Sequence, residues 1–321
     1  MKKLLIKTTL ESTIFEDKHH DNCSVCGRHF VVGETTYLGY NAQKQLINIG
    51  ECCKQCLSST ITDHTYKKRH YKKPNDNDIL WRYLSFPKFV SMLKSQSLFF
   101  TRVDKFEDPF EGAKGIADNE SKWDESYKVF LQQMITHLPK RIDIPYKTHE
   151  QIEACCASLL SDIKIANAIS RQHTYVNCWH KNDFESEAMW KLYCPDIKQG
   201  IAIKTTYGKL FDALNKKRYI QIGEIQYIDY TNKLLEGDDA FWYKRKSFEH
   251  EKEVRAIIHH YQGLEEPVGL NIAVSVSDFI ESIYISPMAP QWLVEIVKDV
   301  SEKYGLSKPI LQSQMTVKPF Y

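Results

Sequence analysis

The stretch SFEHEKEVRAII, residues 247–258, places glutamates at alternate positions ahead of an arginine and an apolar run. In an extended strand successive side chains alternate between the two faces, so Glu251, Glu253 and Arg255 would share one face. On a helix, Glu251 and Arg255 would instead form an i,i+4 ion pair, which contributes only a few tenths of a kcal/mol. The branched apolar run and the turn-like sequence GLEEP at 263–267 favour the strand. We therefore expect the two glutamates to project together from a sheet.

The chain around this stretch alternates between strand-like and helix-like segments from residue 79 onward. Residues 119–170 carry apolar side chains at helical spacing, and these stripes are most simply core. Many short strands, with helices gathered early and late, predict an α+β domain over residues 79–321. Its core is expected to be a mixed or antiparallel sheet, interrupted by a helical insertion at about 113–170.

The overall composition is that of a globular chain with nearly balanced charge. Its 43 basic and 41 acidic residues give a net charge of +2, which neither favours nor excludes nucleic acid as a partner. The opening MKKLLIKTTLEST has too short an apolar run for a secretory signal, and no segment approaches the roughly 20 apolar residues of a membrane helix. Nine cysteines, an odd number, fit cytosolic thiols and a metal site better than a disulfide framework. The sequence predicts a cytoplasmic protein.

Residues 1–64 contain a cysteine pattern typical of a small metal-binding module. Cys23 and Cys26 form one C-x2-C pair, and Cys53 and Cys56 form a second. Two such pairs hold four thiolates at tetrahedral reach of one ion, which predicts a closed structural zinc site. A module of this size cannot build a sufficient core without the ion. The residues between the two pairs are expected to form a β-hairpin.

Other residues could bind the metal at this site. Cys52 could replace Cys53, and a histidine could replace a cysteine; the histidine candidates are His19, His20 and His29. The alternative is a set of buried free thiols, because cysteine ranks among the most buried residue types. The paired spacing favours zinc over free thiols.

A basic run, TYKKRHYKKPNDND at residues 65–78, follows the module. It interleaves Lys and Arg with Tyr66, His70 and Tyr71 and has no periodic apolar positions, so we expect a linker between module and body. Basic groups can meet phosphates while tyrosines stack on bases, which would make the run a nucleic-acid contact. A solvated linker is an equally good interpretation of a short basic run.

Four segments of the body, taken in order, resemble a bacterial domain family of unknown function. They read LWRYLSFPKFVSMLKSQSLFFTRVDKFEDPFEG (80–112), NCWHKNDFESEAMWKLYC with GIAI (177–203), KRKSFEHEKEVRAI (244–257) and IESIYISPMAPQWL (280–293). Members of this family are often encoded near mobile elements and phage-defence genes. The resemblance covers about residues 79–321, and the cysteine module lies outside it.

The first segment is also similar to the start of ADP-ribosyltransferases, especially bacterial toxins that modify nucleic acid. Both begin with an aromatic–basic–aromatic strand, a short helix and a strand that ends in a polar turn. Those folds carry a glutamate on a later strand, in many of them within an E-x-E pair, which Glu251 and Glu253 match in spacing and position. The serine-bearing motif of one subclass is echoed only by Ser186. The resemblance implies an ADP-ribosyltransferase-like fold and a toxin-like effector of bacterial antiphage defence.

This resemblance also implies NAD as the substrate and a role for each glutamate. Cleavage of the bond between nicotinamide and ribose passes through an oxocarbenium-like state. Glu253 would stabilise that positive charge, and Glu251 would act as general base toward the acceptor. NAD would further be bound by an arginine on its pyrophosphate and by aromatic side chains stacked on its rings; the candidates are Arg82, Arg102, Tyr83, Trp190 and Tyr193.

Structural interpretations stand beside these roles. The glutamates and Arg255 could form an ion network on a sheet face, and Trp190 and Tyr193, three residues apart, could be core. Two other functions are open: a non-enzymatic nucleic-acid-binding or sensor protein, and a metal-dependent nuclease that uses Asp108 and Glu111 with the glutamate pair. The implied partners are RNA or DNA and a cognate antitoxin or other defence-system protein.

Overall fold

The computed structural model describes residues 20–66, 71–137, 148–215, 220–231, 235, 237–260 and 267–321. Contacts divide the chain into two compact units, Met1–Lys72 with Leu214–Ile220, and Lys73–Ala213 with Gln221–Tyr321. His19 and residues 67–70 of the predicted linker lie outside the described residues.

The first unit is a three-stranded antiparallel sheet with a cysteine-bearing turn. Its strands β1 (Thr35–Tyr40), β2 (Leu46–Gly50) and β3 (Ser59–Thr65) are ordered β2-β1-β3, and the 3-10 helix η1 (Glu51–Cys56) follows β2. The β1–β2 hairpin confirms the expectation for the residues between the cysteine pairs. A small core forms around the sheet from Cys23, Phe30, Ile47, Ile49, Cys53 and Tyr66.

The second unit is α+β, as the sequence predicts, and is built on a nine-stranded sheet. Its strands are β4 (Ile79–Ser85), β5 (Ser97–Arg102), β6 (Thr174–Lys181), β7 (Gly200–Thr206), β8 (Gln221–Glu224), β11 (Glu253–His259), β12 (Gly269–Ala273), β13 (Ser282–Ile285) and β14 (Ile310–Gln312). Neighbouring strands are antiparallel except β13 and β14, which makes the sheet mixed and mostly antiparallel. A separate parallel pair joins β9 (Gln226–Ile228) to β10 (Tyr243–Arg245).

The large sheet forks at β6. On one edge β6 pairs with β11 along its whole length. On the other edge the pairing with β4 stops at Trp81, opposite His180, and the pairing with β5 begins at Thr101, opposite Val176. Residues 177–179 of β6 therefore face a gap between β4 and β5, which diverge because α2 (Phe86–Ser95) connects them.

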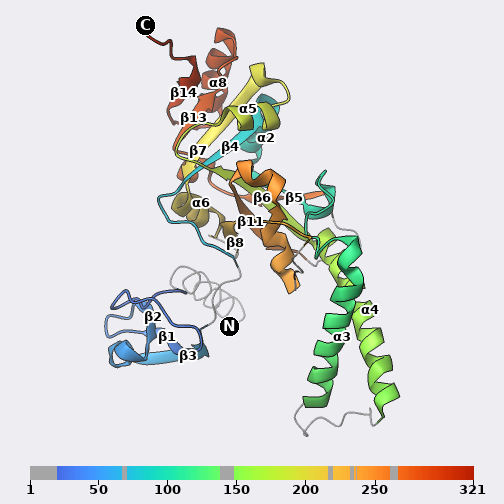
Figure 1. The fold of residues 1–321 in the computed structure, drawn as a ribbon. Helices are drawn as coiled ribbons and strands as arrows, with labels where there is room; N and C mark the ends of the chain where they lie inside the picture. The colour runs from blue at the N-terminus through green and yellow to red at the C-terminus, as the bar shows by residue number, and fades with distance from the viewer. Residues whose placement is uncertain are drawn as a thin grey trace. The chain divides into compact units, whose positions relative to one another are not determined.

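Two long helices, α3 (Glu120–His137) and α4 (His149–His173), pack side by side and form the helical insertion that the sequence predicts (Figure 1). A capping box between Thr148 and Gln151 starts α4. The apolar stripe of α3 is core only near its start. Trp123 is buried, whereas Phe130 and Met134 are 53% and 51% exposed. The prediction that the whole stripe is core was wrong, because two helices alone cannot cover every apolar face.

Shorter helices complete the unit, and no helix of the described residues is long and apolar enough to cross a membrane. The remaining α-helices are α5 (Glu187–Tyr193), α6 (Tyr207–Leu214), α7 (Val276–Phe279) and α8 (Gln291–Lys303). The 3-10 helices are η2 (Val103–Lys105), η3 (Ala117–Asn119), η4 (Ile197–Gln199), η5 (Gly237–Trp242), η6 (Lys246–Glu251) and η7 (Gln314–Thr316).

Candidate functional site

The E-x-E pair straddles an element boundary. Glu253 is the first residue of β11, whereas Glu251 ends η6. Lys252, between them, adopts a left-handed backbone with φ of 41°. The expectation that both glutamates sit on one strand was therefore wrong for Glu251. Only Glu253 and Arg255 share a strand face, as the alternation of a strand requires.

Arg255 is the centre of a buried ion network. Its side chain is 0% exposed. Glu253 binds it through Nε at 2.6 Å and Nη2 at 3.1 Å, and Glu111 binds it through Nη1 at 2.8 Å and Nη2 at 3.1 Å. Both carboxylates are thus held in two-point contacts, the strongest geometry for arginine. These contacts form the ion network that the sequence offered as the structural alternative for Glu253 and Arg255.

Lys244 connects this network to Glu251. Its Nζ lies 2.5 Å from Glu251, 3.4 Å from Glu253 and 3.5 Å from Glu111. The other oxygen of Glu251 accepts a hydrogen bond of 3.0 Å from the hydroxyl of Tyr193. Three carboxylates thus share two cations, Lys244 and Arg255, which leaves one excess negative charge. Glu251 has no contact with Arg255 among these pairs, and its cation is Lys244, which lies closer to it than to the other two carboxylates.

The network sets the protonation states of its members. Burial alone would raise the pKa of Glu253, but Arg255 and Lys244 outweigh burial and lower that pKa to about 2. Burial works against the charged form of Lys244 as well, yet Glu253 and Glu111 raise its pKa above the ordinary value. Burial and the nearby Glu251 raise the pKa of Tyr193, so its hydroxyl stays protonated and keeps donating.

A cleft of about 300 Å³ opens at the fork of the sheet, beside the network. Residues of β4, β5, β6 and α5 line it together with the glutamate pair: Trp81, Arg82, Tyr83, Leu84, Lys88, Thr101, Phe106, Val176, Asn177, Cys178, Trp179, His180, Met189, Tyr193, Glu251 and Glu253. The cleft exists because the gap between β4 and β5 leaves the middle of β6 without a neighbouring strand on that edge. Its volume lies at the lower end of the range for small-molecule sites.

Arg82 brings a cation without a counter-ion into this cleft. Its guanidinium lies 5.7 Å from the ring centre of Trp179, and its buried Nη1 has no hydrogen-bond partner among the described residues. Burial lowers the pKa of Arg82 to about 10, which still leaves the group charged at neutral pH. A buried cation that lacks a partner is costly, so the site favours an anionic ligand.

His180 adds an unpaired acceptor to the same cleft. Its Nδ1 lies 2.5 Å from the backbone carbonyl oxygen of Glu251. A carbonyl only accepts, so Nδ1 carries the proton and Nε2 of the neutral ring is an acceptor. That Nε2 is buried and has no partner among the described residues. Burial lowers the pKa of His180, so the ring is neutral at physiological pH and can accept a hydrogen bond from a ligand.

The structure separates the predicted NAD-binding residues into two groups. Arg82, Tyr83 and Tyr193 line the cleft. Arg102 does not line it, because Asp104 binds its guanidinium through contacts of 2.6 and 3.1 Å. Trp190 is fully buried in a core cluster and donates its indole N–H to Glu185. It is therefore a core residue, which is the structural alternative that the sequence offered.

Sequence reasoning missed the contribution of two residues to this site, Lys244 and Glu111. For His180 it offered both a contact with substrate and a hydrogen-bonded structural role, and favoured the structural role. Lys244 was not singled out, and Glu111 was considered as a metal ligand although it binds Arg255. The sequence carried one usable signal, since His180 stands in the NCWH motif of the second family segment. Strand pairing that brings His180 opposite Glu253 is a tertiary fact, which no local pattern encodes.

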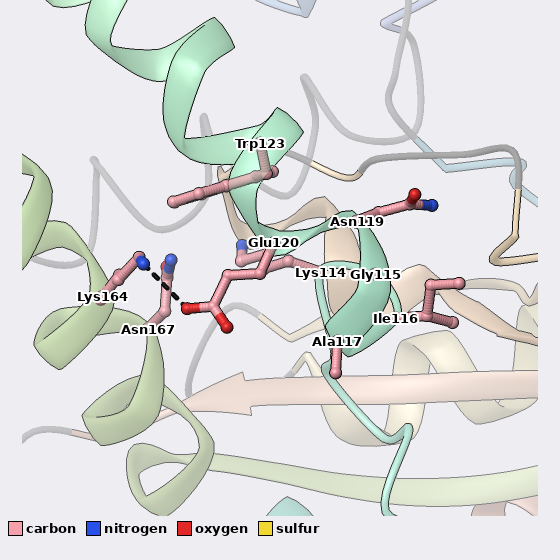
Figure 2. A pocket seen from close by; sticks show the side chains of 9 residues that line it. All are labelled: Lys114, Gly115, Ile116, Ala117, Asn119, Glu120, Trp123, Lys164 and Asn167. Atoms are coloured by element: carbon pink, nitrogen blue, oxygen red, sulfur yellow. Dashed lines mark hydrogen bonds and ion pairs between the residues drawn. The ribbon is translucent and has the colours of Figure 1, made fainter.

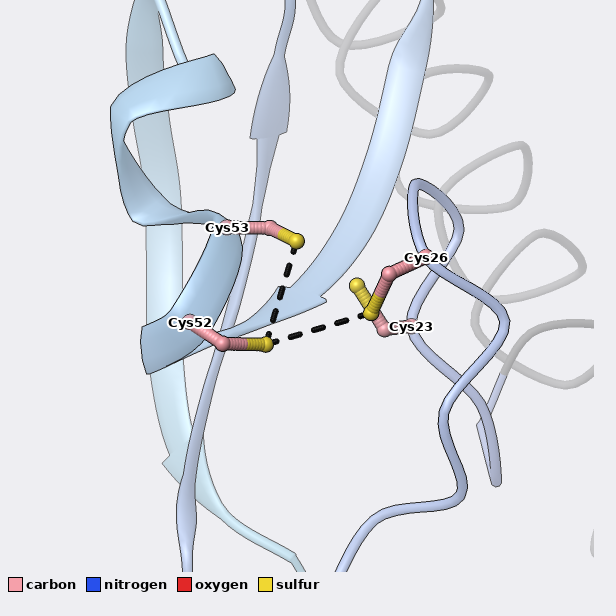
Figure 3. Close-up of side chains that lie close together, drawn as sticks. All are labelled: Cys23, Cys26, Cys52 and Cys53. Carbon is pink, nitrogen blue, oxygen red and sulfur yellow. Dashed lines mark hydrogen bonds between the residues drawn. The ribbon is translucent and has the colours of Figure 1, made fainter.

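The cysteine module gathers four thiols that could hold a metal ion (Figure 3). The sulfur atoms of Cys23, Cys26, Cys52 and Cys53 all lie within 4.8 Å of one another. Sγ of Cys52 lies 3.9 Å from that of Cys26 and 3.8 Å from that of Cys53. A tetrahedral site with metal–sulfur bonds of about 2.3 Å has sulfur separations of about 3.8 Å. The donor set therefore fits a tetrahedral ion.

The fourth ligand differs from the prediction. Cys56 was expected beside Cys53, but Cys52 completes the cluster, and Cys56 packs against the module's core instead. Residues 51–56 form the 3-10 helix η1, in which side chains three positions apart point the same way, so this geometry would favour Cys56 beside Cys53 and does not explain the place of Cys52. His20 and His29 are not members of the cluster.

Local groups shift the pKa values of two of these thiols in opposite directions: burial and the neighbouring cysteines raise the pKa of Cys53 to about 12, whereas the pKa of Cys23 is lowered. Gly27 adopts a φ of 71° in the turn after Cys26, which confirms the tight turn expected of a C-x2-C pair. Burial opposes ionisation of Cys23, but backbone hydrogen bonds from Cys26, Gly50 and Val25 outweigh it and lower the pKa of the thiol to about 7. A thiolate is the form that binds metal.

Comparison with known proteins adds no relative to this picture. No family model, curated protein or solved structure matches the chain.

Proposed function

We propose that this protein transfers an ADP-ribosyl group from NAD to nucleic acid. The observation that carries the proposal is one cleft that combines a cation without a counter-ion, an unpaired neutral acceptor and a carboxylate from a network with one excess negative charge. Arg82, His180 and Glu251 supply these three features. A nucleotide offers their complements, which are a phosphate, sugar hydroxyls and a glycosidic carbon that becomes positive when its bond breaks.

Arg82 is suited to the pyrophosphate of NAD. Its guanidinium lies 5.7 Å from the ring centre of Trp179, and a planar guanidinium binds phosphate oxygens in pairs. A ligand phosphate would supply the counter-ion that the described residues lack. The volume of about 300 Å³ has room for the nicotinamide and its ribose, with the rest of the dinucleotide extending outward.

Glu251 is suited to the charge that develops on the ribose. As the bond between C1′ and the nicotinamide nitrogen breaks, the electron pair leaves with nicotinamide and C1′ acquires oxocarbenium character. A carboxylate in a site of low dielectric stabilises this charge strongly. We assign this role to Glu251 instead of Glu253, because Arg255 holds both oxygens of Glu253.

His180 is suited to take the proton of the acceptor. An acceptor O–H or N–H forms its new bond to C1′ and loses its proton, and the free Nε2 of His180 can bind that proton. The hydrogen bond from Nδ1 to the carbonyl of Glu251 holds the ring in the required tautomer. The resulting imidazolium would lie beside the charge of Glu251, which stabilises it.

The acceptor and the biological role rest on the sequence. The cysteine module and the basic side chains of residues 65–78 support nucleic acid as the acceptor, with the metal as a structural zinc ion. Tyr66 and Tyr71 are buried, so the expected stacking of these tyrosines on bases is wrong. The family resemblance supports a toxin-like effector of antiphage defence, regulated by a cognate antitoxin or another protein of the same system. We propose these as parts of one function.

The other two function classes have less support from the site. A nuclease metal at Asp108 and Glu111 would compete with Arg245 and Arg255, which bind these carboxylates at 2.8 Å. Within the described residues, the groups of potential metal ligands reduce to the cysteine cluster. A binding module without catalysis would not need an unpaired histidine acceptor beside a carboxylate.

Transfer of label tests the proposal. The full chain is incubated with NAD labelled in its adenylate part and with single-stranded and double-stranded RNA or DNA. We expect acid-stable label on nucleic acid, with at least about a hundredfold loss in Glu251→Gln and in His180→Gln. Glu249→Gln, an exposed neighbour on η6, is the matched control and should keep full activity. Bound but unlabelled nucleic acid would support the binding module, and Mg²⁺-dependent cleavage would support the nuclease.

A further inference from the structure

A second cavity lies within the helical insertion, between the start of α3 and α4 (Figure 2). Its volume is about 270 Å³. Residues 114–116, η3, the start of α3 and the second half of α4 contribute its lining: Lys114, Gly115, Ile116, Ala117, Asn119, Glu120, Trp123, Lys164 and Asn167. None of these residues lines the cleft of Arg82 and Glu251. The cavity is therefore a separate candidate site.

Trp123 gives the cavity a flat aromatic wall with an unused donor. The residue is only 6% exposed, and its indole N–H has no hydrogen-bond partner among the described residues. Tyr127 stacks on the indole at a centroid distance of 4.2 Å, which fixes the plane of the ring. A buried donor without an acceptor costs about 1–3 kcal/mol, so a ligand with an acceptor at this point recovers that free energy.

Carboxylates neutralise Lys164, one of the two lysines that line the cavity. Lys164 lies 2.8 Å from a carboxylate oxygen of Glu120 and 2.8 Å from one of Asp124, and Figure 2 shows the first of these pairs. Beside Lys164, the side-chain amide of Asn167 makes no hydrogen bond within the described residues. An amide offers both a donor and an acceptor. This amide and the indole N–H thus give the cavity two neutral polar partners.

We propose that this cavity binds a nucleobase, hydrogen-bonded at its edge by the indole N–H of Trp123 and by the side-chain amide of Asn167. The edge of a nucleobase alternates donors and acceptors, which matches a donor beside an amide. A saturated lipid chain would leave the indole N–H and the amide unpaired.

The proposal holds for a base from a free nucleoside or from a single strand, and the experiment distinguishes these sources. Calorimetric titrations of the full chain use adenosine, guanosine, cytidine and uridine as one set of probes and single-stranded oligonucleotides of the same bases as the other. We expect saturable binding of at least one probe. Tighter binding of the oligonucleotide would identify a strand as the source, and equal binding of both would identify the free nucleoside.

Two variants locate the bound base. Trp123→Phe keeps an aromatic face but removes the donor, and Asn167→Leu removes the amide on a helix that tolerates leucine. Each is expected to weaken binding roughly fivefold to tenfold, which corresponds to one lost hydrogen bond. Lys122→Ala, at an exposed position one residue away from Trp123, is the matched control and should bind as the wild type does.

Three results would overturn the proposal. The first is the absence of saturable binding by any nucleoside or oligonucleotide. The second is unchanged binding in both Trp123→Phe and Asn167→Leu, with their folds verified by unfolding curves. The third is loss of binding in Arg82→Met, because that result would place the base in the other cleft. Failure of the ADP-ribosyl transfer assay would leave these titrations unaffected, since the two cavities share no residue.

Discussion

Arg82 and Arg255 illustrate how two arginines of one sheet serve opposite purposes. Arg255 is saturated by Glu111 and Glu253, so it stabilises the fold and has no capacity left for a ligand. Arg82 has only the face of Trp179, so it is costly to the fold and available to a ligand. A cation that the fold does not satisfy is a candidate for function, because structural stability alone would select against it.

The first prediction concerns this cost. Arg82→Met keeps the apolar stem over Trp179 but removes the buried charge, so the free energy of unfolding should rise by on the order of 1 kcal/mol. Urea unfolding at neutral pH measures this change in the free energy of unfolding. Arg102→Met, which breaks the pair with Asp104, is the matched control and should not stabilise. A clear destabilisation by Arg82→Met would show that the guanidinium has a structural partner.

The second prediction concerns Glu253. Glu253→Gln removes a carboxylate that binds the buried Arg255 at two points, so we expect about 3–5 kcal/mol of destabilisation, against almost none for the exposed Glu249→Gln. The pKa of Glu253 is lowered to about 2 in the folded state, below the unfolded value near 4.3. Its contribution is therefore complete above about pH 4.3 and is lost as the pH falls toward 2. Unfolding curves that keep the same acid dependence in Glu253→Gln would contradict this assignment.

At the scale of elements, the boundary between η6 and β11 shapes the site. The alternating glutamates predicted one continuous strand, but the left-handed backbone of Lys252 ends η6 and starts β11 at Glu253. This turn moves Glu251 off the strand and places its carbonyl on His180. Glutamates at alternate positions do not exclude a helical turn. Charged residues can be exposed on every side of such a turn, so their spacing does not have to match the period of a strand.

The fork of the sheet explains which site residues could be predicted. The strand patterns around Arg82 and Arg255 are local, so the sequence located both strands. The gap between β4 and β5 depends on pairings of β6 with segments some 75 to 100 residues away, which local periodicity does not report. The sequence therefore could not separate Arg82, which lines the cleft, from Arg102, which does not.

The third prediction concerns the element η1 and the identity of the fourth metal ligand. Cys52→Ser should weaken metal binding at least about a hundredfold, because loss of a supporting partner alone can cost that much. Cys56→Ser should bind metal with nearly unchanged affinity. Competition with a chromophoric zinc chelator measures both variants. A larger loss of metal affinity in Cys56→Ser than in Cys52→Ser would identify Cys56 as the fourth ligand, as the paired spacing in the sequence predicts.

At the scale of the whole molecule, the two units depend on different sources of stability. Among its described residues, the first unit has a core cluster of six buried residues, two of which are cysteines of the metal-binding cluster. The second has a nine-stranded sheet with its own extensive core. The α+β class and the existence of a cysteine module were predictable from periodicity and spacing, whereas the sheet order and the cleft depend on contacts between distant segments.

The fourth prediction follows from this difference. Removal of the metal by a strong chelator should unfold the first unit and leave the second folded, because small metal modules draw their folding free energy from the ion. Amide hydrogen exchange of the whole chain should then show loss of protection in β1, β2 and β3, with protection retained in β6 and β11. Chelation that leaves β1 to β3 protected would contradict a structural metal.

The central claim is that the cleft at the fork binds an anionic nucleotide through Arg82, and calorimetric titration with ADP-ribose and with NAD tests it most directly. The wild type and Arg102→Met should bind with the same affinity, and Arg82→Met should bind at least about a hundredfold more weakly, as expected when a charged hydrogen-bonded contact is lost. Equal binding by Arg82→Met and the wild type, or no binding of either ligand by the wild type, would contradict the account.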